Sequence, residues 1–206
     1  RDVQLHKKKE KNCNHYGFKN CETGTNYTYI ALKRKSRLML RPFVGKWNEI
    51  SCLEFWKEVS KRFVPATAKY RFNACTDGNK QNLSALQIAF QNGTVNYSKV
   101  KKIRNGDIVI GMINKCILGN MPKEEIGIRH IDGFCARLRE RVSRYCRKSK
   151  TFSKKKTPFY LHLMIFQVYN NFIEPYVEKK TPCMIEGITS KKWNWKDVFM
   201  EYCLPS

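Results

Sequence analysis

Acidic side chains are scarce in this chain, and the places where they occur give the first indication of chemistry. Aspartate is found only at positions 2, 77, 107, 132 and 197 of the 206 residues. Asp77 follows a short strand-like stretch and precedes Gly78, which permits a sharp turn. Asp132 stands where a helical pattern begins, and a helix dipole favours a carboxylate there. Functional groups often lie at such element ends, so both are candidate site residues; the structural alternatives are a turn aspartate and a helix-start charge.

The charge balance predicts a polyanionic partner. Forty Lys and Arg oppose seventeen Asp and Glu, which gives a formal net charge of +23. Nucleic acid and anionic membrane surfaces are the partners that such a charge favours. No apolar run reaches the ~20 residues that a membrane span needs, so we expect a soluble protein without a membrane partner. With 42% hydrophobic and 13% aromatic residues, the chain has enough apolar matter to fold, and its length predicts one domain.

The basic residues are concentrated after Asp132. Ten Lys or Arg and one acidic residue, Glu140, lie between positions 137 and 156. A helical stripe of cations can follow a nucleic-acid backbone and neutralise several phosphates; the structural alternative is a solvated helix face. The candidate phosphate contacts are Arg137, Arg139, Arg141, Arg144, Arg147, Lys148 and Lys150.

The cysteines and aromatic residues give weaker signals. Nine cysteines without a close CxxC pair predict reduced thiols inside a cell rather than a disulfide framework. Cys13, His15 and Cys21 could hold zinc, but their irregular spacing favours ordinary loop residues. His130 is a metal neighbour or a helix-start residue, and we favour the latter. Trp193 and Trp195, which could stack on bases, are better explained by packing.

Periodicity predicts an α/β protein. Residues 27–44 have the alternation of a hairpin around a charged turn at 33–36, and 69–75 reads as a strand. Helices are expected at 48–63 with a cap at Asn48 or Ser51, and also at 81–90, 131–145 and 159–172. The polar segment 93–119 reads as an insertion with a small hairpin that pairs 108–110 with 116–118.

This order of elements is the one expected of a ribonuclease-H-like mixed sheet flanked by helices. We expect the core in residues 1–156 and a C-terminal helix and aromatic tail, which pack on it, in 157–206. In that arrangement carboxylates from the first strand, a middle strand and a late helix meet around two Mg²⁺ ions. Two such ions can activate a water or a 3′-hydroxyl and stabilise the leaving oxygen at phosphorus.

Seven stretches carry a further signal: residues 6–12, 75–81 (CTDGNKQ), 131–139 (IDGFCARLR), 147–155, 166–172 (FQVYNNF), 181–184 and 193–195. They cover nearly the whole chain, and in this order they closely resemble DDE transposases of the insertion-sequence-one type, which are prokaryotic insertion-element enzymes. It implies a catalytic domain that cuts at transposon ends and joins the freed 3′-hydroxyl to target DNA. The implied cofactors are two Mg²⁺ or Mn²⁺ ions, and the implied partner is double-stranded DNA, both transposon ends and target.

The resemblance also implies the site residues. The second metal-binding carboxylate falls on Asp77 and the third on Asp132, where the family has Glu; Cys135 likewise replaces an Asn of the family pattern. The first carboxylate falls at or just before Arg1, and Asp2 is the nearest aspartate, about two residues out of register. Either Asp2 fills that position through a shifted strand, or the ligand lies upstream of a fragment, or the element has decayed. The family's DNA-end-recognition segments would also lie upstream.

Two functions follow as hypotheses. The first is an active transposase in the cytoplasm or nucleoid of a prokaryote, with assembly into a homo-oligomer on DNA left open. The second is a transposase-derived DNA-binding protein that has lost its carboxylate triad. An RNA-binding protein has less support, because the chain lacks the glycine–aromatic signature of common RNA-binding modules.

Overall fold

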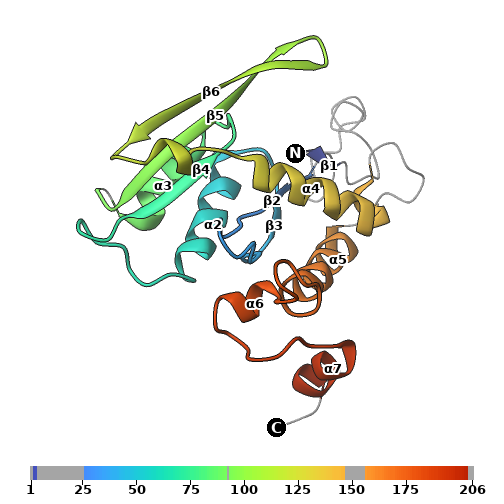
Figure 1. The fold of residues 1–206 in the computed structure, drawn as a ribbon. Coiled ribbons are helices and arrows are strands. Elements are labelled where there is room, and N and C mark those ends of the chain that lie inside the picture. The colour runs from blue at the N-terminus through green and yellow to red at the C-terminus, as the bar shows by residue number, and fades with distance from the viewer. Residues whose placement is uncertain (1, 4–25, 92, 147–155, 204–206) are drawn as a thin grey trace. The chain divides into compact units, whose positions relative to one another are not determined.

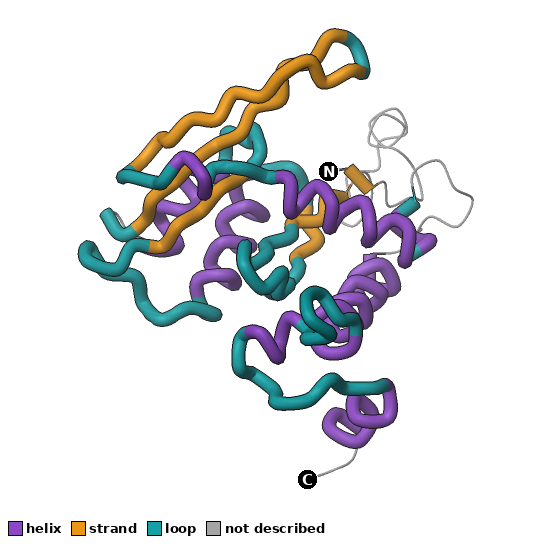
Figure 2. Tube along the Cα trace, viewed as in Figure 1, coloured by secondary structure: helices purple, strands orange, loops and turns teal. Residues whose placement is uncertain are grey.

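A computed structural model describes residues 2–3, 26–91, 93–146 and 156–203 (Figure 1). The protein is a mixed α/β structure in which helices accompany two three-stranded sheets (Figure 2). The chain divides into two compact units. The central unit is Lys46–Phe134, and the terminal unit combines Arg1–Gly45 with Cys135–Ser206. The α/β class expected from periodicity is therefore confirmed.

The sheet of the central unit has the order β4-β5-β6 and mixes parallel and antiparallel pairing. Strand β4 (Phe72–Thr76) runs parallel to β5 (Val95–Asn105), and β5 runs antiparallel to β6 (Ile108–Leu118). The parallel pair needs a crossover, which helix α3 (Asn82–Phe90) supplies. The strand and the helix expected at 69–75 and 81–90 are both present, shifted by one to three residues.

Aromatic packing holds the helices of the central unit together. Helix α2 (Glu49–Ser60) begins at the expected cap, because the Asn48 side chain accepts a hydrogen bond from the Ser51 backbone N–H at 2.9 Å. Trp56 packs edge-to-face on Phe90 of α3, and its indole N–H donates to the Asn82 Oδ1 at 2.9 Å. A buried indole N–H needs such a partner. These contacts join α2 to α3.

The segment 93–119 differs from the sequence-based expectation. The expected pairing of 108–110 with 116–118 is wrong, because Ile108 pairs with Asn105 and Cys116 pairs with Ser98. The segment forms one long β5–β6 ribbon, and β5 is the middle strand of the sheet rather than part of an insertion. Its two-residue turn contains Gly106 at φ 57°, a conformation that glycine adopts without strain. By contrast, Gly78 has no positive φ.

Gly119 closes the end of this ribbon. It has φ +65°, and a Cβ added there would lie 2.0 Å from the Asn96 Oδ1. The Asn96 amide also donates to the Asn73 Oδ1 at 2.8 Å, so it cannot move without losing that bond. We therefore expect Gly119→Ala to lower the free energy of unfolding by about 2 kcal/mol. Urea unfolding measures this change in free energy. The control is Gly127→Ala, because a Cβ added at Gly127 meets nothing within 4 Å. Equal losses in the two variants would contradict the prediction.

In the terminal unit, the expected hairpin is present. Strand β2 (Asn26–Tyr29) pairs antiparallel with β1 (Asp2–Val3) on one side and with β3 (Phe43–Gly45) on the other. Between β2 and β3 the chain makes an isolated bridge, Leu32 to Met39, and turns in the charged stretch that follows Leu32. The hairpin prediction is thus confirmed: the β2–β3 pairs, the isolated bridge and a backbone hydrogen bond from the Leu40 N–H to the Ala31 carbonyl at 3.0 Å join its two arms.

Amide side chains of helix α5 and of the turn that follows it hold this hairpin. Helix α5 (Lys156–Val168) continues into a π-helical turn, Tyr169–Ile173. Asn171, buried in that turn, accepts from the Met39 backbone N–H at 2.9 Å and donates to the Met39 carbonyl at 2.8 Å. The Gln167 amide donates to the same carbonyl at 3.0 Å. The side chains therefore pair with a strand-like backbone in place of another strand.

Helix α4 (Arg129–Arg141) is followed by a short 3₁₀ turn, Ser143–Tyr145. Its first residues belong to the central unit and the rest to the terminal unit. In the terminal unit, Leu138 and Tyr145 are buried, and Tyr145 stacks on Phe159 of α5 with ring centroids 4.2 Å apart. The apolar helical stripe predicted for 131–145 is confirmed at these positions.

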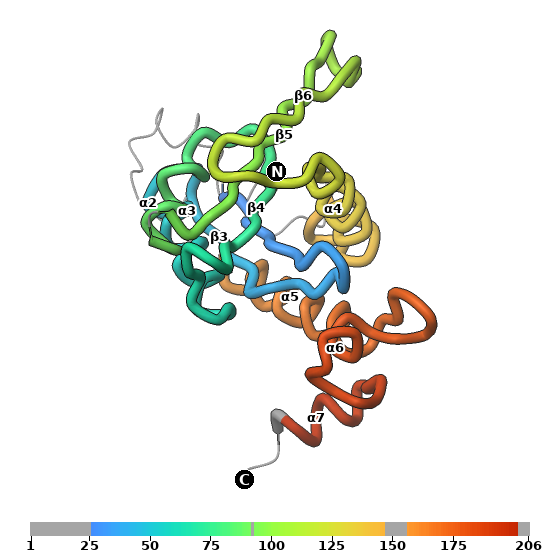
Figure 3. Tube along the Cα trace, turned by 60° about the vertical axis from the view of Figure 1, so that its left-hand side comes forward, coloured from blue at the N-terminus to red at the C-terminus, as the bar shows by residue number. Residues whose placement is uncertain are grey.

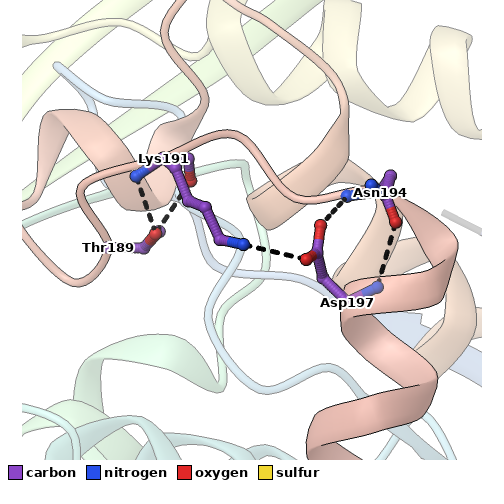
Figure 4. A network of polar contacts seen from close by, with 4 residues as sticks. All are labelled: Thr189, Lys191, Asn194 and Asp197. Atoms are coloured by element: carbon purple, nitrogen blue, oxygen red, sulfur yellow. Dashed lines mark hydrogen bonds and ion pairs between the residues drawn. The ribbon is translucent and has the colours of Figure 1, made fainter.

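The chain ends in two short helices, α6 (Pro182–Ile185) and α7 (Trp195–Cys203), coloured red in Figure 3. Asn194 and Asp197 cap the start of α7 reciprocally, each side chain accepting from the other's backbone N–H (Figure 4). Lys191 donates to the Asp197 carboxylate at 2.9 Å. No helix among the described residues has the length and apolarity required to cross a bilayer.

Candidate functional site

Asp77 lies exposed, directly after β4 and at the carboxyl end of that strand. Its Oδ1 accepts a hydrogen bond from the Asn79 backbone N–H at 3.3 Å, and the Asn79 side chain accepts from the Gln81 N–H at 3.1 Å. These two turns lead into α3. Asp77 is therefore the turn residue that its sequence context predicts, and its carboxylate also faces solvent at a strand end.

The buried Tyr97 holds the backbone that precedes Asp77. Its hydroxyl shares a 2.8 Å hydrogen bond with the Thr76 hydroxyl, from the neighbouring parallel strand. Burial raises the pKa of Tyr97, and the nearby Asp77 carboxylate raises it further, while the bond to Thr76 lowers it. Burial likewise raises the pKa of the Cys52 thiol to about 11, with Asp77 contributing. Tyr97 and Cys52 are therefore neutral near pH 7.

Asp132 lies in the first turn of α4, as the sequence predicts. Its carboxylate forms an ion pair within the protein, because the Lys102 ammonium of β5 donates to Oδ2 at 2.5 Å. Both side chains are largely covered, with 17% of Lys102 and 28% of Asp132 exposed. A covered ion pair of this kind is costly to break on one side only, because the remaining charge keeps its desolvation cost. Lys102 thus neutralises Asp132.

The described side chains do not complete the metal site that the resemblance implies. No three His, Cys, Asp or Glu groups within the described ranges stand close enough together to hold an ion. Asp77 and Asp132 are hard oxygen ligands of the right kind, both in the central unit. The remaining member of the predicted set, Asp2, lies in β1 of the terminal unit. The structure describes its backbone but not its side chain. The Mg²⁺ or Mn²⁺ site therefore stays a prediction.

The basic stripe is partly engaged within the terminal unit. Arg137 donates to the Asn170 side chain, and Arg141 pairs with Glu174 at 3.3 Å. The Arg144 Nε donates to the His162 Nε2 at 3.2 Å. Arg139 is half-buried, whereas Arg147, Lys148 and Lys150 lie outside the described residues. Structural partners within the protein are therefore present for Arg137, Arg141 and Arg144. Any phosphate contact would use the guanidinium N–H groups that these hydrogen bonds do not occupy.

Other sequence candidates resolve as follows. Trp193 packs on Phe172 with ring centroids 4.5 Å apart, as the packing interpretation predicts. Trp195 stacks on Tyr169 at 6.3 Å but is 43% exposed, so its choice between packing and base stacking stays a prediction. His130 lies in the first turn of α4, as a helix-start residue does. Cys13, His15 and Cys21 fall outside the described residues. The cysteines at positions 52, 75, 116, 135, 146 and 183 are free thiols.

Sequence reasoning missed two residues of the site, Tyr97 and Lys102. Both lie on β5, in the segment that was expected to be an insertion. The dipeptide Asn105-Gly106, a strong hairpin signal, could have located the ribbon and with it the strand that carries them. Nothing in the sequence, however, links Lys102 to Asp132, because that contact depends on how α4 lies along β5.

In comparisons with known proteins, no family model, curated protein or solved structure matches the chain.

Proposed function

We propose that this chain is the catalytic domain of a DDE-type DNA transposase with a ribonuclease-H-like fold. In this proposal it binds transposon ends and target DNA in a prokaryotic cell and transfers a 3′-hydroxyl into the target. The observation that carries the proposal is the placement of two carboxylates in one unit. Asp77 directly follows the first strand of a parallel pair, and Asp132 lies in the first turn of the helix that follows the sheet.

The order of elements supports the proposed fold. Three antiparallel strands precede a helix, a strand, a helix and a parallel strand, and a carboxylate-bearing helix follows them. This is the order from which the ribonuclease-H-like expectation was drawn, with β6 as an addition. The net charge of +23 supports the proposed substrate, because a polyanion is the partner that such a charge attracts.

Within this proposal the chain's own residues have distinct tasks. Asp77 presents an exposed carboxylate on a backbone fixed by the Thr76–Tyr97 hydrogen bond. Asp132 presents a second carboxylate, whose charge Lys102 balances while DNA is absent. Lys102 can turn to a phosphate when that carboxylate gains another cationic partner. The divalent ions of the resemblance remain part of the proposal, and no step is assigned to them from these side chains.

A second function is favoured by one specific contact. The 2.5 Å ion pair between Lys102 and Asp132 supplies a protein cation where a catalytic carboxylate would need to be accessible. Asp132 is also shorter by one methylene than the Glu that the resemblance implies, and a displacement of about 1 Å can cost on the order of a hundredfold in a positioned reaction. A transposase-derived DNA-binding protein without strand-transfer activity would have this arrangement.

A strand-transfer assay tests the proposal and separates the two functions. Duplexes that end in a free 3′-hydroxyl, cut from the DNA flanking the gene, are incubated with plasmid and Mg²⁺ or Mn²⁺, and joined products are counted by sequencing. We expect the wild-type chain to give joined products and Asp132→Glu to give more of them. DNA binding without joining in either variant would reject the enzyme in favour of the binding protein. Absence of DNA binding would reject both.

A further inference from the structure

The distal part of the β5–β6 ribbon exposes an unusual number of aliphatic side chains. The exposed fractions are 40% for Ile103, 72% for Ile108, 39% for Val109, 64% for Ile110, 48% for Met112 and 49% for Ile113. We call these six residues the ribbon ridge. Single exposed aliphatics are common on protein surfaces, but a contiguous group marks an interaction site. The ridge lies at the turn end of a ribbon that extends beyond the helices of the central unit (Figures 1 and 3).

The central unit leaves the ridge uncovered at its edge as well as on its faces. Strand β6 ends the sheet order of the described residues, so its outer backbone groups have no strand beside them there. Both members of cross-strand pairs such as Asn105–Ile108 and Arg104–Val109 are exposed. Since successive side chains of a strand point to opposite faces, both faces of the tip are open to a partner.

The charges around the ridge indicate what that partner is. The ribbon carries five cations, Lys99, Lys101, Lys102, Arg104 and Lys115, and one anion, Asp107. Lys101, Arg104 and Lys115 are exposed. A second copy of this chain would bring the same excess of positive charge to the contact, on top of its total of +23. A polyanion with an apolar surface recessed between its charges complements the ridge far better.

Double-stranded DNA has that construction in its major groove. The groove is about 12 Å wide, admits a two-stranded β-ribbon, and offers the methyl groups of thymine as apolar contacts between two phosphate rails. The ribbon beyond Lys102, whose side chain is covered in its contact with Asp132, contains three residues of β5, which span roughly 10 Å at the rise of a strand. This length exceeds the groove depth of about 8.5 Å. The tip can therefore reach the bases while the flanking cations stay at the phosphates.

We propose that the ribbon ridge enters the major groove of double-stranded DNA and places Ile108 and Ile110 against thymine methyl groups. The inference rests on the proposed function, since it assigns a DNA contact to the same unit that carries Asp77 and Asp132. It also relates contact and chemistry, because Lys102, the partner of Asp132, lies on the same strand as the tip. DNA held by the ridge is thus led toward Asp132.

The experiment compares two duplexes that differ only in the thymine methyl group. Binding of the full chain to a labelled duplex of A·T pairs is measured by fluorescence anisotropy, then repeated with uracil in place of thymine. The variant is Ile108→Asn/Ile110→Asn, which changes no charge. The matched control is Val64→Asn/Ile88→Asn, two aliphatics of the same unit that are 88% and 61% exposed.

We expect the wild type and the control to bind the thymine duplex about fivefold more tightly than the uracil duplex. The ridge variant should lose about tenfold in affinity for the thymine duplex and should not distinguish the two duplexes. Its dependence on salt should stay that of the wild type, because no phosphate contact is removed. The comparison of the two duplexes with the wild type needs no variant to fold.

Three results would overturn the proposal. Equal binding of thymine and uracil duplexes by the wild type would remove the methyl contact, and wild-type affinity in the ridge variant would remove the ridge. A DNA-free dimer in sedimentation that the ridge variant dissociates, with DNA affinity intact, would assign the ridge to a second copy instead. Failure of the wild type to bind either duplex would reject the proposed function itself. The three results above would reject only the ridge contact and would leave the proposed function standing.

Discussion

Replacing Asp77 by Asn is expected to lower the rate of strand transfer by at least about a thousandfold, as removal of one member of a catalytic set does. Asn has nearly the shape of Asp and keeps an Oδ1 that can accept from the Asn79 N–H, so the turn into α3 is retained. What is lost is the negative charge at an exposed strand end. The effect is measured as joined products per unit time, with DNA binding followed in parallel.

The control for this variant removes an equal charge elsewhere in the same unit. Glu124 is exposed in a short 3₁₀ turn before α4, and Glu124→Gln should leave the transfer rate within about twofold of the wild type. Loss of one negative charge should slightly favour the proposed DNA binding in both variants. Comparable transfer rates in the Asp77→Asn and Glu124→Gln proteins would show that Asp77 is only a turn residue.

Replacing Asn171 by Ala is expected to lower the free energy of unfolding by about 3 kcal/mol. The side chain is 5% exposed and satisfies both the N–H and the carbonyl of Met39, which is 1% exposed. Its removal leaves buried backbone groups without those partners, and each unpaired group carries a desolvation cost of about 1–3 kcal/mol. Gln167 still donates to the carbonyl, so the N–H of Met39 is the group most affected.

Urea unfolding followed by far-ultraviolet circular dichroism measures this loss. Asn114→Ala is a suitable control, because Asn114 is exposed on β6, and a change there should cost less than about 0.5 kcal/mol. A loss below 1 kcal/mol for Asn171→Ala would mean that water replaces the side chain at Met39. The hairpin would then not depend on the asparagine.

The sequence predicts the elements whose signals are local. Helix α2 is correctly placed because Asn48 is a good cap and because Phe55, Trp56 and Val59 recur at helical spacing and are buried. Asp77 is correctly placed at a strand end because the strand stops where its apolar pattern stops. Each of these predictions needs only the residues within one turn or one strand.

The ribbon could not be predicted in the same way. Strand alternation is visible when one face of a strand is buried and the other is not, whereas the outer half of the β5–β6 ribbon is exposed on both faces. Ile108, Val109 and Ile110 therefore follow one another without alternation. The turn at Gly106 was the remaining local signal, and it marks a position but not the length of the strands.

The sequence pointed to the two carboxylates of the candidate site but not to the side chains that contact them. Asp77 and Asp132 are distinctive because aspartate is scarce in the chain. Lys102 is one of forty basic residues, and only the register of β5 against β6 and the approach of α4 distinguish it. The same holds for Arg137 and Arg144, whose partners, Asn170 and His162, are more than fifteen residues away in the chain.

The exposed edge of β6 has a consequence for the handling of the purified protein. Residues 108–113 (IVIGMI) form an uncharged apolar segment without proline, the pattern of an aggregation-prone strand, on a sheet edge that other chains can extend. Mutual repulsion between molecules of charge +23 keeps such edges apart, and salt screens that repulsion within about 3 Å at 1 M. High salt, which strips nucleic acid from basic proteins, will therefore promote aggregation of this one in DNA-free solution.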